Sequence, residues 1–326
     1  MNTVRTRALA NLALVKYFGK RDLSLNLPAA GSLSVTLEPL ETITEVTADG
    51  SLSCDEVWLA GKRATGKFEE RVSRFLGLVR QLTGNKQFFR VATTNSFPTA
   101  AGLASSASGF AALALGATRC AGLDLGADEL SVLARRGSGS AARSITAGVS
   151  LWRAGEKDDG SDSFATTIVS PEEWDLRVVV GVTDFASKAV GSTEAMEHTR
   201  LTSPYYEAWI RSVETDLSDA VQAIQDRDFS VLGQVTERSA LSMHAATLAS
   251  RPAIPYWNGT TVEALHLIRR LRGEGLDVYF TCDAGPQPKA LCTAESADVV
   301  QQHLERLPGV KSVIPCRLGA GASVLS

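Results

Sequence analysis

The segment at residues 98–109, Pro-Thr-Ala-Ala-Gly-Leu-Ala-Ser-Ser-Ala-Ser-Gly, constrains the fold of this chain more than any other stretch. It follows an alternating run at 88–94 that predicts a strand, and it leads into an alanine-rich run at 107–118 that predicts a helix. The start of a helix presents unpaired N–H groups and a positive dipole end, and both suit a phosphate. The layout therefore predicts a phosphate-binding loop, with a loop of small residues packed on a sheet as the alternative.

This loop does not match either of two well-known nucleotide-binding motifs. It lacks the Gly-Lys-Ser/Thr ending of a Walker A motif and the Gly-x-Gly-x-x-Gly of a dinucleotide fingerprint. Its small residues Ala101, Gly102 and Ala104 would still let a ligand approach the backbone closely. Ser105 and Ser106 could cap the helix and offer hydroxyls to phosphate oxygens or to a metal.

Composition narrows the class of protein and of partner. The 326 residues are enough for two domains and a sizeable core, and the content of 44% hydrophobic and 21% charged residues is typical of a soluble globular protein. The net charge of −3 gives no reason to expect nucleic acid or an acidic membrane as a partner. The sequence has no apolar run of membrane-spanning length, and its start lacks a signal-peptide core.

Cysteine and histidine usage indicates the compartment and argues against a metal site. Five cysteines without Cys-x-x-Cys spacing predict reduced thiols in a cytoplasm, not a disulfide framework or a zinc site. Four scattered histidines do not predict a metal cluster.

Three charged residues stand out against their surroundings. Lys16 lies inside the apolar run 12–18, where a lysine needs a partner, so the basic stretch with Lys20 is either an anion site or a solvated strand end. Arg143 lies in a second small-residue loop at 137–144. This loop is either a turn without a binding role or a binding site for a carboxylate or phosphate. Asp283 follows a predicted strand and precedes a Gly-Pro turn, which it could simply cap.

The remaining patterns predict an α+β protein in two halves. Segments 32–37 and 42–47 alternate cleanly around Pro39 and predict an antiparallel pair of strands, and 184–193 predicts a hinge into a mostly helical second half. Helices are predicted at 68–82, 128–136, 204–226, 229–248, 260–272 and 294–307. Further strands are predicted at 3–18, 147–152, 177–183, 276–281 and 310–314.

Four motifs in order along the chain resemble those of the diphosphomevalonate decarboxylase family, within the GHMP kinase superfamily. They are residues 10–22, 97–106, 137–144 and 283–286, and segments 188–196 and 242–245 add weaker matches. The resemblance implies a GHMP kinase fold of two domains, with the active site in the cleft between them. Residues 1–184 would be similar to ribosomal protein S5 domain 2, and residues 185–326 would be ferredoxin-like.

The resemblance also implies the reaction, with ATP and Mg²⁺ as cofactors and a homodimer as the assembly. ATP would phosphorylate the tertiary 3-hydroxyl of mevalonate 5-diphosphate, and loss of phosphate and carbon dioxide would then give isopentenyl diphosphate. The implied catalytic residues are Asp283, Lys16 and Arg143, of which Arg143 would hold the substrate carboxylate. The diphosphate end would be bound by Tyr17, Lys20, Ser138, Gly139, Ser140 and Ser192. ATP would be bound by Pro98, Ala101, Gly102, Leu103, Ala104, Ser105, Ser106 and Lys188, with Mg²⁺ held at Ser106 through the ATP phosphates.

Two departures from the family pattern leave the substrate open among related mevalonate phosphates. The family usually has Trp where this chain has Phe18, and Asn where it has Gln287. The alternatives are therefore a phosphomevalonate decarboxylase and a mevalonate 3-kinase. A homoserine kinase and a non-catalytic ATP-binding protein on the same fold are further rivals, both disfavoured by the joint presence of Lys16, Arg143 and Asp283.

Overall fold

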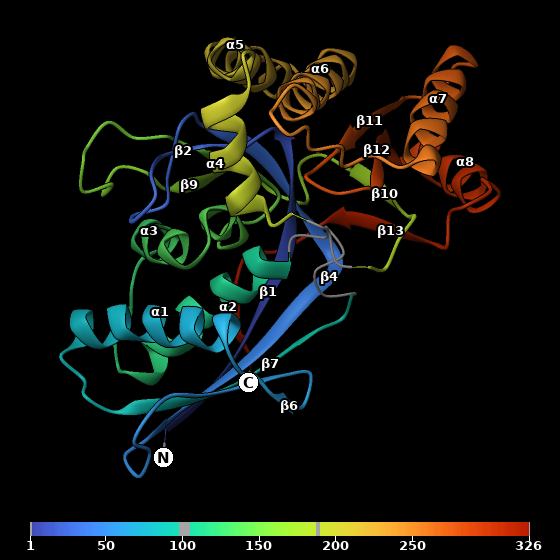
Figure 1. The fold of residues 1–326 in the computed structure, drawn as a ribbon. Coiled ribbons are helices and arrows are strands. Elements are labelled where there is room, and N and C mark those ends of the chain that lie inside the picture. Colours follow the sequence, from blue (N-terminus) through green and yellow to red (C-terminus); the bar gives the residue numbers. More distant parts are fainter. Residues whose placement is uncertain (1, 98–104, 187–189, 326) are drawn as a thin grey trace.

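The computed structural model describes residues 2–97, 105–186 and 190–325. Figure 1 shows helices packed around one large, mostly antiparallel sheet, which confirms the predicted α+β class. The strands follow the order β11-β12-β10-β13-β4-β7-β5-β6, and β1, β8, β9 and β14 join beside this path. Among the described residues, none of the helices is both long and apolar enough to cross a membrane.

Two long strands form the centre of the molecule. β1 (Asn2–Val15) runs antiparallel to β4 (Ser32–Asp49) along nearly its whole length. The pair of strands predicted at 32–37 and 42–47 is therefore wrong, because both segments belong to the single strand β4. Pro39 lies opposite the register shift at Leu9 and Ala10, so its missing N–H falls where the regular ladder is already interrupted.

β4 is long because three different strands pair with its second edge in turn. Residues 32–35 pair with β8 (Val149–Trp152), residues 37–38 with β13 (Ser312–Leu318), and residues 42–49 with β7 (Phe88–Asn95). The prolonged strand thereby connects the sheet of the N-terminal half to that of the C-terminal half. This sharing of one edge is not visible in the local alternation of the sequence.

Three helices cover the N-terminal part of the sheet. They are α1 (Lys67–Thr83), α2 (Ser105–Cys120) and α3 (Ala127–Gly137), and each confirms a predicted helix. α2 packs on β1 and β4, and its buried alanines allow the helix to lie close to the strands. The small strands β5 (Glu56–Leu59) and β6 (Lys62–Arg63) form the outer edge. Two-residue β3 (Leu27–Pro28) pairs with β2 (Lys20–Asp22) apart from the main sheet.

The C-terminal strands have the β-α-β-β-α-β plan of a ferredoxin-like unit. β10 (Leu176–Val182), β11 (Val278–Cys282), β12 (Pro288–Thr293) and β13 lie in the order β11-β12-β10-β13. α7 (Gly259–Gly273) and α8 (Ala294–Glu305) pack against them, and Figure 1 shows both helices far from α1 and α3. The boundary between residues 184 and 185 stays a prediction, and the pairing of β10 favours an earlier one.

The helices between β10 and β11 close the top of the molecule in Figure 1. α5 (Tyr206–Gln225) and α6 (Phe229–Leu248) confirm two predicted helices and bury an apolar face toward β1 and β4. α4 (Ser192–Thr202) was not predicted, and it takes up the last two residues of the predicted hinge at 184–193. Residues 187–189 of that hinge lie outside the described residues. The remaining strands are β9 (Ala165–Val169), which pairs with β8, and β14 (Ser323–Leu325), which pairs with β1.

Candidate active site

The candidate site is centred on Asp283, which follows β11 directly. Its Oδ1 lies 2.8 Å from Nζ of Lys16, and its Oδ2 lies 3.4 Å from Nζ of Lys289. The side chain of Lys16 is 1% exposed and that of Asp283 is 25% exposed. The lysine predicted to need a partner therefore finds one 267 residues away in the sequence.

The two lysines strongly affect the protonation of Asp283. Burial alone would raise the pKa of Asp283, but the ammonium groups of Lys16 and Lys289 outweigh burial and hold that pKa well below its usual range. Burial lowers the pKa of Lys16, and its pairing with Asp283 offsets part of this effect. Asp283 is therefore an anion, ready to accept a hydrogen bond from a hydroxyl group.

The turn after Asp283 is fixed from two sides. The carbonyl of Pro286 accepts hydrogen bonds from the hydroxyls of Thr183 at 3.1 Å and Thr261 at 2.5 Å. The side-chain carbonyl of Gln287 accepts from N–H of Thr183 at 2.6 Å, and its NH₂ donates to the carbonyl of Asp184. The residue that departs from the family pattern thus ties the Asp283 turn to the end of β10.

Arg143 lies in the short 3₁₀-helix η1 (Gly139–Ser144) and is almost completely buried. Its Nε donates to Asn11 at 3.1 Å and its Nη1 donates to the hydroxyl of Ser32 at 2.6 Å. The rings of Tyr17 and Trp152 lie 5.8 and 5.5 Å from the guanidinium carbon. Burial lowers the pKa of Arg143 to about 10, so the guanidinium remains charged at neutral pH. It is a rigidly held cation suited to a carboxylate.

Tyr17 faces the second small-residue loop. A Cβ atom at Gly139 would lie 2.3 Å from the Tyr17 hydroxyl oxygen, so the contact requires a glycine at this position. The hydroxyl is buried, and no hydrogen-bond partner is found for it among the described residues. A buried hydroxyl without a partner is costly, and a ligand atom could satisfy it.

Lys20 is held beside the same loop by Asn26. Its Nζ donates to Oδ1 of Asn26 at 2.6 Å, and the amide nitrogen of Asn26 donates to the carbonyls of Arg135 and Arg136 at the end of α3. Burial, followed by the charge of Arg71, lowers the pKa of Lys20 to about 8. The lysine is thus a cation whose charge is lost at moderately alkaline pH.

The serine residues predicted for phosphate binding lie on three elements. Ser138 follows α3, and its hydroxyl lies 3.3 Å from that of Ser106 and 3.5 Å from that of Ser140. Ser105 and Ser106 form the start of α2, and Ser192 is the first residue of α4. The predicted ATP-binding residues Pro98, Ala101, Gly102, Leu103, Ala104 and Lys188 lie outside the described residues.

Sequence reasoning missed two cations of the candidate site, Lys289 beside Asp283 and Arg71 beside the second small-residue loop. Lys289 lies within the otherwise apolar strand β12, the same signal that drew attention to Lys16, and it was overlooked there. Arg71 on α1 donates to the carbonyl of Gly137 at 2.8 Å and so reaches the second small-residue loop. Nothing local in the α1 sequence distinguishes Arg71 from an ordinary exposed arginine.

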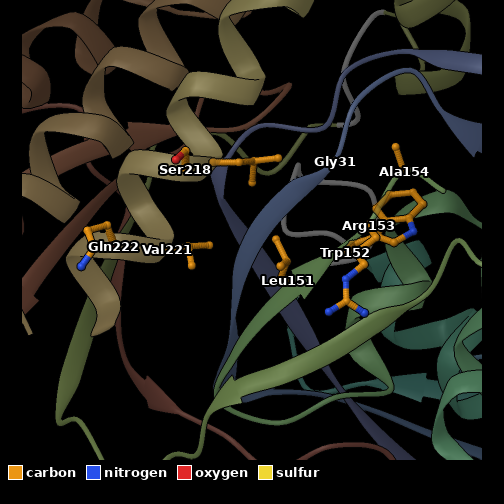
Figure 2. Close-up of a pocket in the computed structure, with 9 residues that line it drawn as sticks. Gly31, Leu151, Trp152, Arg153, Ala154, Ser218, Val221 and Gln222 are labelled. Atoms are coloured by element: carbon orange, nitrogen blue, oxygen red, sulfur yellow. The ribbon is translucent and has the colours of Figure 1, made fainter. Parts of the chain in front are cut away.

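A separate hollow of about 460 Å³ lies between β8 and α5. Figure 2 shows Leu151 and Trp152 on one side of it and Val221 and Gln222 on the other. Its lining is mostly apolar, and it contains neither Asp283 nor the two lysines. The hollow therefore does not coincide with the candidate site.

Comparisons with known proteins agree over the whole chain. Residues 8–165 match the model of a diphosphomevalonate decarboxylase-like N-terminal domain, and residues 178–317 match that of a mevalonate 5-diphosphate decarboxylase C-terminal domain. Diphosphomevalonate decarboxylase mvd1 of Aspergillus fumigatus is 38% identical over 93% of this chain and 80% of its own length.

Solved structures extend this agreement to the fold. Mevalonate diphosphate decarboxylase from Staphylococcus aureus is 37% identical, with a TM-score of 0.94 over 100% of this chain and 98% of that one. MDDEF in complex with MVAPP, AMPPCP and magnesium is 39% identical, with a TM-score of 0.92 over 99% of both chains. These matches confirm the predicted GHMP kinase fold. In sequence and in structure, the chain belongs to the diphosphomevalonate decarboxylase family.

Proposed function

We infer that this chain catalyses the ATP-dependent decarboxylation of mevalonate 5-diphosphate to isopentenyl diphosphate, a step of the mevalonate pathway of isoprenoid biosynthesis. The observation that carries the inference is the ion pair between Asp283 and Lys16, with Arg143 buried nearby, in a chain that matches such enzymes from end to end. The homologues are named for this reaction and not for the monophosphate or kinase alternatives.

Asp283 is the group proposed to act on the 3-hydroxyl of the substrate. Its carboxylate would accept a hydrogen bond from the hydroxyl and align the oxygen for attack on the γ-phosphorus of ATP. It would take the proton as the new O–P bond forms and the bond from the γ-phosphorus to the bridging oxygen breaks, which releases ADP. The low pKa of Asp283 makes it a weak base, so alignment precedes proton transfer. Lys16 would keep the carboxylate in place.

The second half of the reaction depends on charge stabilisation. When the C3–O bond breaks, phosphate leaves and positive charge develops at C3, close to the Asp283 anion. The C1–C2 bond then breaks and carbon dioxide leaves. The electron pair of the broken bond forms the C2–C3 double bond. Arg143 would orient the departing carboxylate, while Tyr17, Lys20 and the other predicted diphosphate-binding residues would hold the far end of the substrate.

The described part of the proposed ATP site fits phosphates and Mg²⁺. Ser105 and Ser106 place short hydroxyl side chains in the first turn of α2, and Ser106 is exposed. Mg²⁺, when bound with ATP, would supply charge neutralisation at the transferred phosphoryl group. Ser106 would hold it through the ATP phosphates. The part of the site at residues 98–104 and 188 stays a prediction.

A direct assay tests the function. Release of carbon dioxide and of ADP should be measured with mevalonate, its 5-phosphate and its 5-diphosphate side by side. We expect both products, in equal amounts, with the 5-diphosphate. ADP without carbon dioxide would identify a kinase, preference for the 5-phosphate would identify a phosphomevalonate decarboxylase, and binding of ATP without turnover would identify a binding protein.

Ser106→Ala should weaken the use of ATP and Mg²⁺ while leaving the fold intact. The change removes one exposed hydroxyl at the start of α2 and leaves the apolar face of the helix untouched. Loss of one hydrogen bond to a charged group predicts a rise in KM for ATP of about tenfold or more. Steady-state kinetics at varied Mg²⁺ concentration measures this. ATP kinetics equal to those of the parent would reduce Ser106 to a packing residue.

The affinity for mevalonate 5-diphosphate should fall as the pH rises through about 8. Lys20 is a cation below its lowered pKa of about 8 and neutral above it, so its attraction for the diphosphate is present at lower pH and lost at higher pH. The pH profile of kcat/KM for this substrate should therefore fall above pH 8. In Lys20→Arg the charge persists, so the part of the fall that begins near pH 8 should disappear; an unchanged profile would contradict the assignment.

We also propose that the protein is a cytoplasmic homodimer. All five cysteines are free thiols, and four of them are buried, which supports a reducing compartment. The dimer rests on the family resemblance alone. Sedimentation equilibrium at micromolar concentration tests it directly, and a mass of one chain would contradict it.

A further inference from the structure

We propose that Lys289 is a positioning residue for Asp283. Lys16 and Lys289 each contact a different oxygen of its carboxylate. Lys16 holds Oδ1 at 2.8 Å, and Lys289 stands at 3.4 Å from Oδ2. The inference rests on the proposed function, because it concerns the carboxylate that acts on the substrate hydroxyl. Lys289 lies outside all the sequence motifs that resemble the family.

The surroundings of Lys289 do not call for a lysine. It lies in β12 between β10 and β11, opposite Val180 and Thr281, and it is 3% exposed. Its neighbours Ala290 and Leu291 are completely buried and apolar. Desolvating an ammonium group is expensive, and well-packed apolar residues in place of a buried ion pair are often as stable. Stability therefore gives no reason for a lysine here, whereas an anion that must be kept charged and oriented does.

The two contacts leave the carboxylate oxygens unequal. Lys16 is itself fixed, because its Nζ also donates to the carbonyl of Ala13 at 2.7 Å and its backbone N–H donates to Ser239 at 3.0 Å. Lys289 also donates to the carbonyl of Gln287 at 3.3 Å, and both of its contacts are longer. Oδ1 is thus tightly bound, and Oδ2 keeps more capacity to accept a hydrogen bond. We assign Oδ2 as the oxygen that meets the substrate hydroxyl.

The charged and titratable groups around this pair come from five elements. They are Lys16 after β1, Arg143 in η1, His244 on α6, Cys282 at the end of β11, and Lys289 on β12, and each interacts electrostatically with Asp283. Burial lowers the pKa of His244 to about 3 and raises that of Cys282 to about 11. Both stay neutral through the working range, so neither of them contributes to the local pH response.

Lys289 also affects Lys16. Two ammonium groups that share one carboxylate repel each other, and this repulsion adds to burial in lowering the pKa of Lys16. Removing the charge at position 289 should therefore raise the pKa of Lys16. If turnover needs protonated Lys16, the alkaline fall of kcat moves to higher pH in such a variant. This fall is separate from that of Lys20, which concerns substrate binding and kcat/KM.

The test compares Lys289→Met, Lys289→Arg and a matched control, Lys62→Met, in the full chain. Lys62 is exposed on β6, at the opposite end of the sheet from β12. For each, kcat and both KM values are measured from pH 5.5 to 10 by carbon dioxide release, together with the melting temperature. Misplacement of a reacting group predicts a fall in kcat of roughly 10- to 100-fold in Lys289→Met. Loss of the like charge predicts an upward move of the alkaline fall by about one pH unit.

Three outcomes decide the proposal. It is supported if Lys289→Met shows both the fall in kcat and the upward move of the alkaline fall, with nearly parental KM values. Lys289→Arg should then restore the position of the alkaline fall, and Lys62→Met should behave like the parent. It is overturned if Lys289→Met keeps the parental kcat and pH profile, or if its loss of activity only follows its folded fraction. A parent protein that releases no carbon dioxide would instead refute the proposed function.

Discussion

Replacing Asp283 with asparagine should lower kcat by roughly two to four orders of magnitude, the usual worth of a general base. The amide keeps the shape of the side chain but loses its charge and its basicity. A tertiary alcohol is a poor nucleophile, so transfer of the phosphoryl group depends on an aligned carboxylate. Binding of ATP, measured by titration without the second substrate, should change little.

The same substitution should also lower stability, because Asp283 is the counter-charge of two buried lysines. In Asp283→Asn, Lys16 and Lys289, which are 1% and 3% exposed, face a neutral amide. Leaving buried charges without a partner is strongly destabilising, unless the lysines lose their protons. We therefore expect a lower melting temperature, and a larger loss at acidic than at alkaline pH.

A double variant separates these two effects. In Asp283→Asn combined with Lys289→Met, one of the two uncompensated charges is gone, so the melting temperature should recover in part while kcat stays low. If Asp283 only held its turn, activity would instead recover with the folded fraction. Folded Asp283→Asn protein with parental carbon dioxide release would remove Asp283 from the mechanism.

The sequence was most informative where a residue contradicted its surroundings. Lys16 in an apolar run indicated a buried partner, and the structure supplies Asp283. The same logic applies to Lys289 in β12, but a run of six residues after a Gly-Pro turn is too short to establish a buried strand from its pattern alone. Amphipathic helices such as α1 and α6 were predicted well, because their periodicity extends over several turns.

Long-range arrangements were beyond local patterns. Pro39 indicated a break between two strands, yet β4 continues through it because different strands pair on either side. The hydroxyl of Tyr17 meets Gly139 across 122 residues, and Arg71 reaches Gly137 from α1. Such contacts depend on how elements pack, which motifs shared with a family can imply but periodicity cannot.

Arg143→Lys should lower kcat/KM for mevalonate 5-diphosphate by about 10- to 100-fold, with little change in the KM for ATP. The guanidinium is fixed by Asn11 through Nε and by Ser32 through Nη1, which holds it in one orientation beside two aromatic rings. A lysine keeps the charge but cannot make both of these contacts and also offer two parallel N–H groups to a carboxylate. Both a higher KM and a lower kcat are therefore expected, since the carboxylate must be held until carbon dioxide leaves.

Ser32→Ala provides the graded comparison for this prediction. It removes the 2.6 Å contact with Nη1 and keeps the arginine, so it should weaken the same kinetic parameters by a smaller factor. If Arg143→Lys and Ser32→Ala have equal effects, the reaction depends on the orientation of the guanidinium more than on its two parallel N–H groups. An effect of Arg143→Lys confined to the KM for ATP would place Arg143 on the nucleotide side. In that case the carboxylate of the substrate would need another cation, and the two lysines beside Asp283, which leave a surplus positive charge there, would be the first to test.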